Sequence, residues 1–537
     1  MPTSHSTSPG GVSGPAMRDH LVFYLNGQRH TAGASEATLT LSEYLRDGHG
    51  SAGRLCGTKI ACAEGDCGAC TVLVGKPVPG EDRLVYETLD ACIAFVFQMD
   101  RRHVVTVEGV GGKPETTPAT RLTPPQQAMV ICHGSQCGYC TPGFVMALHG
   151  LAEAASQDVP PKGYSEDELR LGLSGNLCRC TGYEQILEAG RSLAAQTVGP
   201  LDQRYDAAAI CADFAQLGET SVRLGGSNAP PNGAPNGSIK VLTKGPAHDA
   251  AATSGGIFLP ATLDELLTHR AAYPSARLVS GATDLGVQRN HRKITIHDVI
   301  LTTRVPELDR LEVQDGVLHV GAAVSWSRLE AFTRELLPAY HAILTRFGSP
   351  QVRNAGSLVG NLANASPIAD SIPFHYVACS TLELASVRGV RSVPIADFYQ
   401  GYKQLDLAPD EVITNLATPL PTQDVALRLY KISKRRDMDI STVTMAFWIE
   451  RKKDRIDSVR LAAGGVGPTV VRLPRAEAAL RDGEFTLEAM RAAGRLAREE
   501  ITPLTDVRGA AAYRLQLVEN LFAKCWHELA GTAAVRA

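Results

Sequence analysis

Four cysteines near the start of the chain have a spacing that suits iron–sulfur chemistry. Cys62, Cys67 and Cys70 lie in the segment GTKIACAEGDCGAC, and Cys92 follows after a short interval. This C-x4-C-x2-C…C spacing is typical of the four thiolate ligands of a [2Fe-2S] cluster. Glycines between the cysteines allow the loop backbone to approach the cluster closely. A zinc site or a set of disulfides is the alternative, but zinc sites more often use paired C-x2-C knuckles.

A second set of cysteines has a C-x2-C…C-x-C arrangement. Cys137 and Cys140 form the pair in CGYC, and Cys178 and Cys180 form the pair in CRC. Taken alone, this spacing also suits a zinc knuckle. Beside the first loop, a second [2Fe-2S] cluster is the better interpretation. Five further cysteines fall in no cluster pattern and are expected to be buried structural thiols. They are Cys56, Cys132, Cys211, Cys379 and Cys525.

The order of these motifs resembles the iron–sulfur portion of the molybdenum hydroxylase family. The first cysteine loop is followed by QCGYCTPGF at 136–144 and then by GNLCRCTGY at 175–183. Both motifs are long and specific, and agreement of both in this order by chance is improbable. The resemblance implies two [2Fe-2S] clusters bound by the eight cysteines of the two sets.

The elements that hold the cysteines can be inferred from local patterns. Residues 21–25 predict a strand, and Asn26-Gly27 predicts a hairpin turn after it. A helix is expected from about Thr40. Strands and a helix around the first loop suit a ferredoxin-like β-grasp domain over residues 19–108. Thr141-Pro142 and the capping box that begins at Ser165 start helices, which predicts a helical [2Fe-2S] domain over residues 109–195.

Two segments are too polar and too rich in Pro, Gly and Ser to bury a core. Residues 1–18 are expected to form a disordered tail, within which Met17 is an alternative start of translation. The segment GGSNAPPNGAPNGS at 225–238 predicts a flexible linker, placed over residues 196–254.

Two glycine-bearing segments follow the linker, RLVSGATDLG at 277–286 and FGSPQVRNAGSLVGNLANASPIAD at 347–370. Neither matches the Walker A motif or the GxGxxG dinucleotide fingerprint. The first, taken alone, is an ordinary turn. Together, two such loops can donate backbone N–H groups to a pyrophosphate from both sides.

Both segments resemble the FAD domain of the same family, whose fold is that of vanillyl-alcohol oxidase. The resemblance implies an α+β multidomain chain with an FAD-binding domain over residues 255–424 and a small α+β C-terminal flavoprotein domain over residues 425–537. The sequence departs from the family pattern at two positions. Ala282 stands where many relatives have Asn, and Val359 replaces one glycine of a pair. The implied FAD contacts are Leu278, Val279, Ser280, Gly281, Ala282, Thr283, Asp284, Leu285, Phe347, Ser357, Leu358, Val359, Gly360, Asn361, Asp370, Ile413 and Lys431.

A charged segment, KISKRRDMDIS at 431–441, follows these loops in the chain. A charge run is ordinarily a solvated face. In the family, this stretch passes close to the flavin. The resemblance therefore implies NAD as the electron acceptor, with Tyr402, Arg435 and Asp437 on the NAD side.

Composition excludes several classes of protein. The net charge of -3 argues against a partner bound through nucleic-acid phosphates. No apolar stretch approaches the length of a membrane helix, and the first residues lack the apolar core of a secretory signal. Eight thiolates that must stay reduced to hold iron suit the cytoplasm.

Two one-electron clusters and a flavin together imply an electron-transfer chain. Nothing in the sequence corresponds to the family's molybdenum domain. The resemblance thus implies an iron–sulfur and flavin subunit that works with a separate molybdopterin-binding large subunit, expected as an α2β2 heterotetramer. That partner would hydroxylate xanthine or hypoxanthine with oxygen from water, and electrons would reach NAD through this chain. No residue of this chain is expected to catalyse the hydroxylation.

Two other functions remain open. The first is the equivalent subunit of a hydroxylase that acts on aldehydes, nicotinate or carbon monoxide, although several of these carry clusters and flavin on separate chains. The second is a free-standing electron carrier or redox sensor. A sensor is expected to carry a DNA-binding or signalling module, and none is visible in the sequence.

Overall fold

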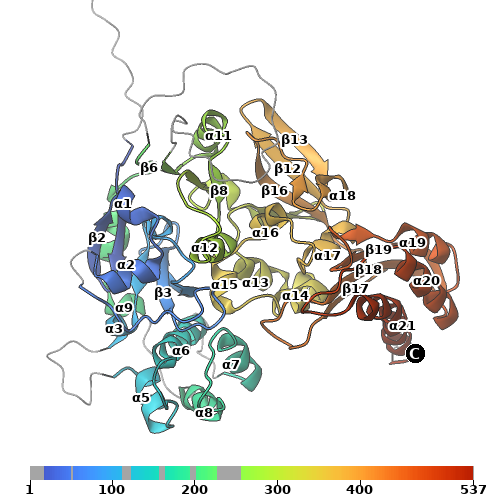
Figure 1. The fold of residues 1–537 in the computed structure, drawn as a ribbon, viewed down its shortest axis with the longest axis horizontal. Helices are drawn as coiled ribbons and strands as arrows, with labels where there is room; N and C mark the ends of the chain where they lie inside the picture. The colour runs from blue at the N-terminus through green and yellow to red at the C-terminus, as the bar shows by residue number, and fades with distance from the viewer. Residues whose placement is uncertain are drawn as a thin grey trace, which may run out of the picture.

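The computed structural model describes residues 17–49, 53–111, 122–156, 164–193, 201–226 and 256–535. Figure 1 shows the N-terminal part on the left, a helical part below it, a larger α/β part in the middle and the C-terminal part on the right. Among the described residues, none of the helices is long and apolar enough to cross a membrane.

The N-terminal domain is a five-stranded mixed sheet with helices against it. Its strand order is β2-β1-β5-β3-β4, in which only β1 and β5 pair in parallel. Asn26 and Gly27 have φ angles of 50° and 81°, as the predicted two-residue hairpin turn requires. The elements are β1 (Leu21–Leu25), β2 (Gln28–Ala32), α1 (Ala34–Ala37), α2 (Leu41–Asp47), β3 (Thr71–Pro77), β4 (Leu84–Asp90), η1 (Val96–Met99) and β5 (His103–Val105).

The second domain is helical, and the two helices that the sequence predicts begin at the expected positions. Thr141 is the first residue of α6, and Ser165 caps α7 in a capping box with Glu168. The elements are α3 (Val107–Val110), α5 (Pro124–Ile131), α6 (Thr141–Ser156), α7 (Glu166–Gly172) and α8 (Glu184–Leu193).

The predicted tail (1–18) and the predicted linker (196–254) both include residues that are ordered in the structure. Arg18, placed in the tail, forms an ion pair of 2.7 Å with the buried Asp100. Residues 201–226, placed in the linker, fold as α9 (Leu201–Arg204), α10 (Ala207–Gln216) and β6 (Val222–Leu224). The apolar residues of α10 pack in the helical core, which explains why this stretch is ordered. Residues 1–16 and 227–255 lie outside the described residues.

The third domain contains two larger sheets and a small two-stranded sheet formed by β14 and β15. The first has the order β6-β7-β9-β8, and the second is antiparallel with the order β10-β11-β16-β12-β13. The first part comprises β7 (Ile257–Leu259), α11 (Leu263–Ala272), β8 (Arg277–Val279), α12 (Thr283–Asn290), β9 (Val299–Leu301) and η2 (Pro306–Leu308). The second comprises β10 (Leu311–Gln314), β11 (Val317–Gly321), α13 (Trp326–Leu336), α14 (Pro338–Leu344), α15 (Pro350–Ala355), α16 (Leu358–Asn364), α17 (Ile372–Val377), β12 (Thr381–Ser386), β13 (Gly389–Pro394), α18 (Ile395–Phe398), β14 (Tyr399–Gly401), β15 (Gln404–Leu405) and β16 (Val412–Pro419).

The C-terminal domain packs three helices on a four-stranded sheet of order β17-β18-β19-β20. Its elements are β17 (Val425–Ile432), β18 (Val443–Lys452), β19 (Arg455–Gly464), β20 (Val471–Arg472), α19 (Pro474–Leu480), α20 (Leu487–Glu499) and α21 (Ala511–Val535).

The hydrophobic cores do not follow the domain boundaries. One core joins β1 and α2 of the N-terminal domain to β6, β7 and β9 of the third domain. A second core joins β3 and β4 to the helical domain. The N-terminal domain therefore lies between its two neighbours and shares apolar surface with both, which fixes their positions more firmly than polar contacts alone.

Candidate iron–sulfur and flavin sites

The first cysteine set converges at one edge of the N-terminal domain. The thiols of Cys67 and Cys92 donate hydrogen bonds to Cys62, which lowers the pKa of that thiol. Cys92 also donates to Cys70 and lowers its pKa in the same way. Cys70 and Cys92 are each 2% exposed, whereas Cys62 and Cys67 are half-buried. Four sulfurs from one loop and one following segment thus share a single, mostly buried site.

The loop between Cys62 and Cys70 takes a shape that requires glycine. Gly65 and Gly68 have φ angles of 72° and 63°, a region that glycine enters without strain. The N–H of Glu64 donates to the sulfur of Cys62 at 3.4 Å. Such N–H contacts stabilise negative charge on a ligating sulfur.

A buried acid beside this site was not predicted. Asp90 is 1% exposed, and its carboxylate accepts from the Cys70 thiol at 3.6 Å. Burial raises the pKa of this carboxyl well above its usual range, and the neighbouring Cys70 raises it further. The sequence shows that Asp90 lies two residues before Cys92, but it gives no sign that the carboxylate is buried.

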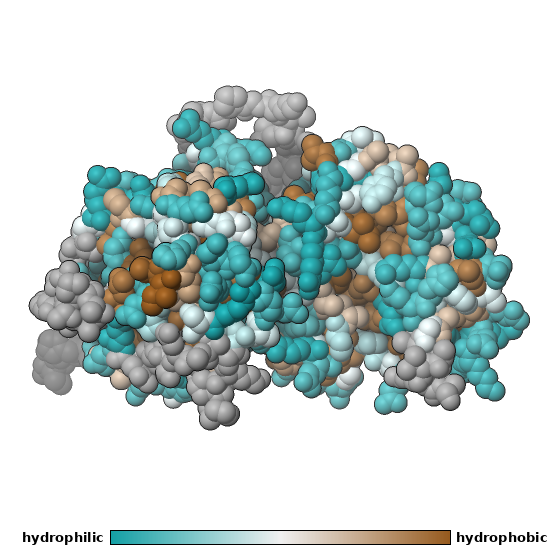
Figure 2. All heavy atoms as spheres, turned by 90° about the horizontal axis from the view of Figure 1, so that it is seen from below, coloured by the Kyte–Doolittle hydropathy of each residue, from teal (hydrophilic) through white to brown (hydrophobic). Residues whose placement is uncertain are grey.

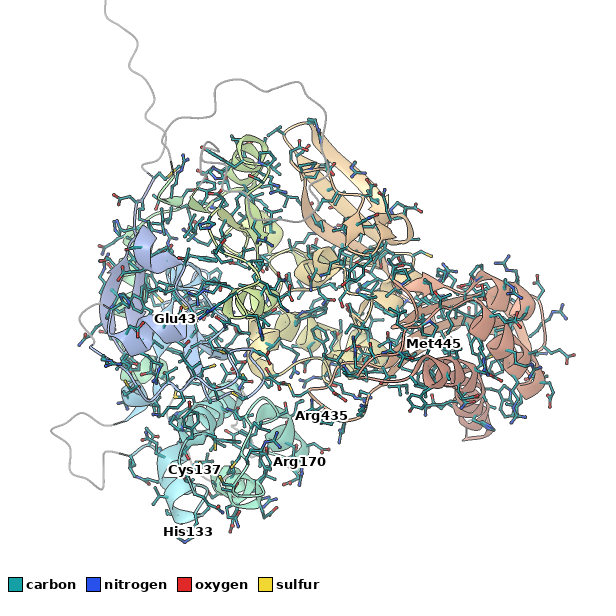
Figure 3. All side chains as sticks on the ribbon, in the orientation of Figure 1. Glu43, His133, Cys137, Arg170, Arg435 and Met445 are labelled. Carbon is teal, nitrogen blue, oxygen red and sulfur yellow. The ribbon has the colours of Figure 1, made fainter. Side chains whose placement is uncertain are left out.

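The second cysteine set also converges, at the surface of the helical domain. Cys137 interacts with Cys180, and Cys140 with Cys178, and burial raises the pKa of Cys140 to about 12. The sulfur of Cys178 accepts from the N–H of Cys180 at 3.4 Å and from the Thr181 hydroxyl at 3.2 Å. Cys137 and Cys180 are exposed. Figure 3 shows Cys137 at the lower edge of the molecule, far from the C-terminal domain that carries Met445.

Both sites fit a two-iron cluster, because each offers four sulfurs together with donors that point at sulfur. In the part of the chain that the structure describes, no group of three or more His, Cys, Asp and Glu residues is arranged to hold a single metal ion. Of the five other cysteines, Cys211 and Cys525 are buried as expected. Contrary to expectation, Cys56 and Cys132 are only half-buried and Cys379 is exposed. Cys379 ends a helix with a φ angle of 55°, and this turn holds its side chain at the surface.

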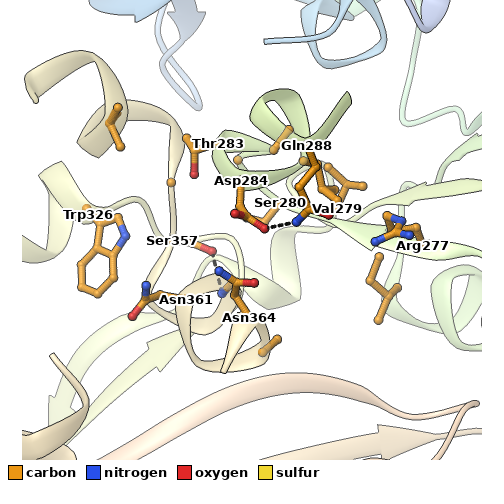
Figure 4. Close-up of a pocket in the computed structure, with 18 of the residues that line it drawn as sticks. Arg277, Val279, Ser280, Thr283, Asp284, Gln288, Trp326, Ser357, Asn361 and Asn364 are labelled. Atoms are coloured by element: carbon orange, nitrogen blue, oxygen red, sulfur yellow. Dashed lines mark hydrogen bonds between the residues drawn. The ribbon is translucent and has the colours of Figure 1, made fainter. Parts of the chain in front are cut away.

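The two glycine-bearing segments meet at a cavity of about 340 Å³ in the third domain. It lies between the first turn of α12 and the first turn of α16, as Figure 4 shows. No side chain caps α12, so its first N–H groups remain available to a ligand. The N-terminal ends of two helices carry partial positive charge, which suits a phosphate. Gly360 borders open space, where an added Cβ would meet only the Ser357 hydroxyl, at 3.0 Å.

Most of the predicted FAD contacts line this cavity. All eight residues from 278 to 285 do so, as do Phe347, Ser357, Gly360 and Asn361. Leu358, Val359 and Ile413 are instead buried in the hydrophobic core. Asp370 and Lys431 form a buried ion pair with side chains 6% and 2% exposed, and neither borders the cavity. The lining of the cavity gives these five assignments no support, and all of the FAD contacts stay predictions.

Several residues that line the cavity were not predicted. Asn364 extends the face of α16 that already carries Ser357 and Asn361, so helical spacing from Gly360 could have found it. Trp326 packs on Phe347 with ring centroids 4.7 Å apart, a contact that no sequence signal indicates. The other residues on the cavity wall are Arg277, Gln288, Val352, Gly356 and Ala363.

Helix α12 connects this cavity to the first cysteine site. Its first turn borders the cavity, and near its end the Asn290 amide donates to the carbonyls of Ala63 and Cys92, both at 2.8 Å. A Cβ at Gly286 would lie 2.4 Å from the carbonyl oxygen of Ile93, so helix and cluster segment touch through backbone. An eight-residue helix is about 12 Å long, which sets the scale of the separation between the two sites.

The residues assigned to the NAD side lie in two places. Tyr402 is 61% exposed at the turn between β14 and β15, where the neighbouring Lys403 donates to Asn364 at 2.8 Å. Arg435 lies in the loop after β17, close enough to Asp66 of the first cysteine loop to oppose the rise in its pKa that burial causes. Asp437 lies in the same loop. Among the described residues, no contact joins Tyr402 to Arg435 or Asp437.

These sites define a class of protein: an oxidoreductase that combines [2Fe-2S] and FAD domains. Three family models match the chain. Residues 106–191 match a "[2Fe-2S] binding domain", residues 252–421 the "FAD binding domain in molybdopterin dehydrogenase" and residues 428–529 the "CO dehydrogenase flavoprotein C-terminal domain". These three matched domains fit the molybdenum hydroxylase family.

Similar proteins include several named xanthine dehydrogenases. The one from Emericella nidulans is 31% identical over 95% of this chain and 39% of its own length. The one from Drosophila pseudoobscura pseudoobscura is 31% identical over 96% of this chain and 40% of its own length. The chain therefore spans about two fifths of the length of these curated relatives.

Solved structures cover about half of the chain. Quinoline 2-oxidoreductase from Pseudomonas putida 86 is 27% identical, with a TM-score of 0.48 over 51% of this chain and 96% of that one. Carbon monoxide dehydrogenase from Hydrogenophaga pseudoflava is 25% identical, with a TM-score of 0.48 over 50% of this chain and 94% of that one.

Proposed function

We propose that the chain is the electron-transfer subunit of a molybdenum hydroxylase, and specifically of a xanthine dehydrogenase. It would pass electrons from a molybdenum centre on a partner subunit through two [2Fe-2S] clusters to FAD and then NAD. The observation that carries this proposal is the continuous series of contacts between the three sites. The N–H of Leu177, next to Cys178, donates to the carbonyl of Cys67 at 3.0 Å, and α12 links Cys92 to the flavin cavity.

Burial supports this order of electron flow. The site of Cys137, Cys140, Cys178 and Cys180 lies at the surface, so an external donor can approach it. The site of Cys62, Cys67, Cys70 and Cys92 lies deeper and touches both the surface site and α12. A flavin accepts or donates one or two electrons, and FAD bound in the cavity would therefore join one-electron clusters to a hydride acceptor.

We further propose that the molybdopterin-binding partner docks on the helical domain. Figure 2 shows an apolar patch at the left of the face seen from below, where Figure 1 places this domain. Its exposed apolar residues on and beside α5 are Leu122, Val130 and Ile131, exposed by 42%, 63% and 73%. Beside them, an apolar groove of about 320 Å³ extends to Ser135 and Thr141, which flank the CGYC motif. Exposed apolar surface next to an exposed cluster site favours a protein partner that delivers electrons there.

Xanthine is favoured over other substrates because iron–sulfur and flavin domains share one chain, as in the xanthine dehydrogenases that match 95% and 96% of it. Co-expression with a molybdopterin-binding large subunit is expected to yield a stable α2β2 complex that forms NADH when xanthine is added. The chain alone is expected to oxidise NADH with an artificial dye and to leave xanthine unchanged. Xanthine turnover by the chain alone would contradict the division of labour. Turnover of an aldehyde, nicotinate or carbon monoxide by the complex, without turnover of xanthine, would identify a different hydroxylase.

A further inference from the structure

Three segments meet in a buried junction between the two cluster sites. Thr71 follows Cys70, Asn176 lies two residues before Cys178, and Gln351 belongs to α15 of the flavin domain. Their exposed fractions are 3%, 5% and 1%. A buried polar side chain needs hydrogen-bond partners. Here each of the three finds at least one in another domain, and the Oε1 atom of Gln351 has none among the described residues.

Gln351 donates at both ends of the junction. Its side-chain amide donates to the Thr71 hydroxyl at 3.2 Å and to the side-chain oxygen of Asn176 at 2.9 Å. Asn176 in turn donates to the carbonyl of Gly68 at 3.0 Å and to the Thr71 hydroxyl at 3.3 Å. One amide from the flavin domain is thus hydrogen-bonded to the loops that carry both clusters.

The backbones around this junction approach one another too closely for side chains. A Cβ at Gly68 would lie 2.3 Å from the carbonyl oxygen of Gly175. A Cβ at Gly143 would lie 2.2 Å from the carbonyl oxygen of Gly68, and one at Gly175 would lie 2.1 Å from the amide oxygen of Gln351. The separation of the two cluster loops is therefore set by direct backbone contact and by the hydrogen bonds of the Gln351 side-chain amide to both loops.

On α15, Gln351 is the residue whose side chain is hydrogen-bonded to both cluster-bearing loops, and the other side chains of this helix have different partners. Val352 borders the flavin cavity. Arg353 holds the carbonyl of Gly348 at 2.8 Å and pairs with Glu330. Asn354 donates to the carbonyl of Thr88 in β4 at 2.9 Å, so it docks the same two domains without a hydrogen bond to either cluster loop.

We propose that Gln351 is a positioning residue that fixes the separation of the two cluster-bearing loops from the flavin domain. The inference rests on the proposed function, since it requires a cluster in each cysteine site. Without the amide donors, the Thr71 hydroxyl and the Asn176 oxygen would each lose a buried partner. The two loops would then settle at a different distance, and electron transfer between the clusters would change with it.

The test compares Gln351→Met with Asn354→Leu in the full chain loaded with clusters and FAD. Each substitution keeps the side chain's approximate size and removes an amide from the same helix. Both variants are expected to keep about four irons per chain, since a [2Fe-2S] cluster holds two. The readout is the magnetic splitting between the two reduced clusters in the electron paramagnetic resonance spectrum, which falls with the cube of their separation.

We expect Gln351→Met to change this splitting and Asn354→Leu to leave it at the wild-type value. Thr71→Val removes the hydroxyl at the other end of the same hydrogen bond and should also change it. An unchanged splitting in Gln351→Met, or an equal change in Asn354→Leu, would overturn the proposal. Loss of a cluster from Gln351→Met would also overturn it, because the amide would then serve cluster binding and not spacing. Absence of two cluster signals from the wild-type protein would instead refute the proposed function.

Discussion

The contact between α12 and the segment around Cys92 can be tested with the substitution Gly286→Ala. This substitution should stabilise the fold if α12 makes no such contact, and destabilise it if the contact exists. Gly286 lies inside α12, where Ala is preferred over Gly by about 1 kcal/mol. If α12 only had to be a helix, Gly286→Ala would stabilise the protein. The structure predicts the reverse, because the added Cβ would meet the backbone of Ile93, next to Cys92.

The size of the clash gives the magnitude. The Cβ would lie 2.4 Å from the carbonyl oxygen of Ile93, whereas ordinary contact begins at 3.4 Å, so helix and cluster segment must separate by about 1 Å. Backbone atoms cannot rotate away, and overpacking of this kind costs about 1–3 kcal/mol. Subtracting the gain in helix propensity of about 1 kcal/mol from the middle of this range, we expect a net loss of about 1 kcal/mol, or about 2–4 °C in the unfolding temperature of a unit of about 150–250 residues.

The assay is thermal unfolding at one scan rate, followed through the visible absorbance of the clusters and the fluorescence of the flavin. Gly531→Ala is the matched control, because Gly531 lies in α21 with nothing within 4 Å of an added Cβ. The control should be neutral or slightly stabilising. If Gly286→Ala behaves like the control, α12 does not pack on the cluster segment, and the link between the flavin cavity and the first cluster is wrong.

Three further predictions concern the sites and the core. Cys67→Ser should lower the iron content from about four to about two per chain and remove one cluster signal, and a single tetranuclear cluster or bound zinc would disprove the assignment. Gly360→Val should empty the flavin site and leave both clusters formed, because its side chain enters open space in the cavity, and full FAD content in the purified variant would refute the site. Burial lowers the pKa of His375 to about 3, so below pH 6.5 this residue binds a proton mainly in the unfolded chain. Between pH 6.5 and 5.5 this weakens the fold by about 1 kcal/mol, and the slope approaches about 1.4 kcal/mol per pH unit below that. His375→Gln should therefore flatten the loss of stability between pH 6.5 and 5.5, and an unchanged slope in denaturant unfolding would show that His375 is not held neutral.

Local signals in the sequence were sufficient for many elements. The turn at Asn26-Gly27, the helix start near Thr40 and the cap at Ser165 are set by residues within one turn of chain, and the structure confirms them. The cysteine spacing likewise predicted two groups of four, and the structure brings both groups together. The turn and the helix starts depend on residues that are close in the chain, and the cysteines are recognised because all of them can bind iron.

Contacts between domains could not be predicted in this way. Gln351 and Asn176 are separated by 175 positions and meet only because the cores on both sides of the N-terminal domain hold three domains together. Residues 201–226 carry a signal that the linker prediction overlooked, because AAAICADFAQ at 207–216 has apolar residues at helical spacing that pack in the helical core. The left-handed φ angle of 59° at Ala282 is also invisible in the sequence, because alanine gives no signal for that conformation.

The most direct test of the electron-transfer chain is an anaerobic reductive titration of the purified chain. Absorbance reports on the flavin, and electron paramagnetic resonance reports on each cluster. We expect uptake of about four electrons per chain, two by FAD and one by each of two spectroscopically distinct [2Fe-2S] clusters. Uptake of about two electrons, with no paramagnetic cluster signal, would contradict this expectation.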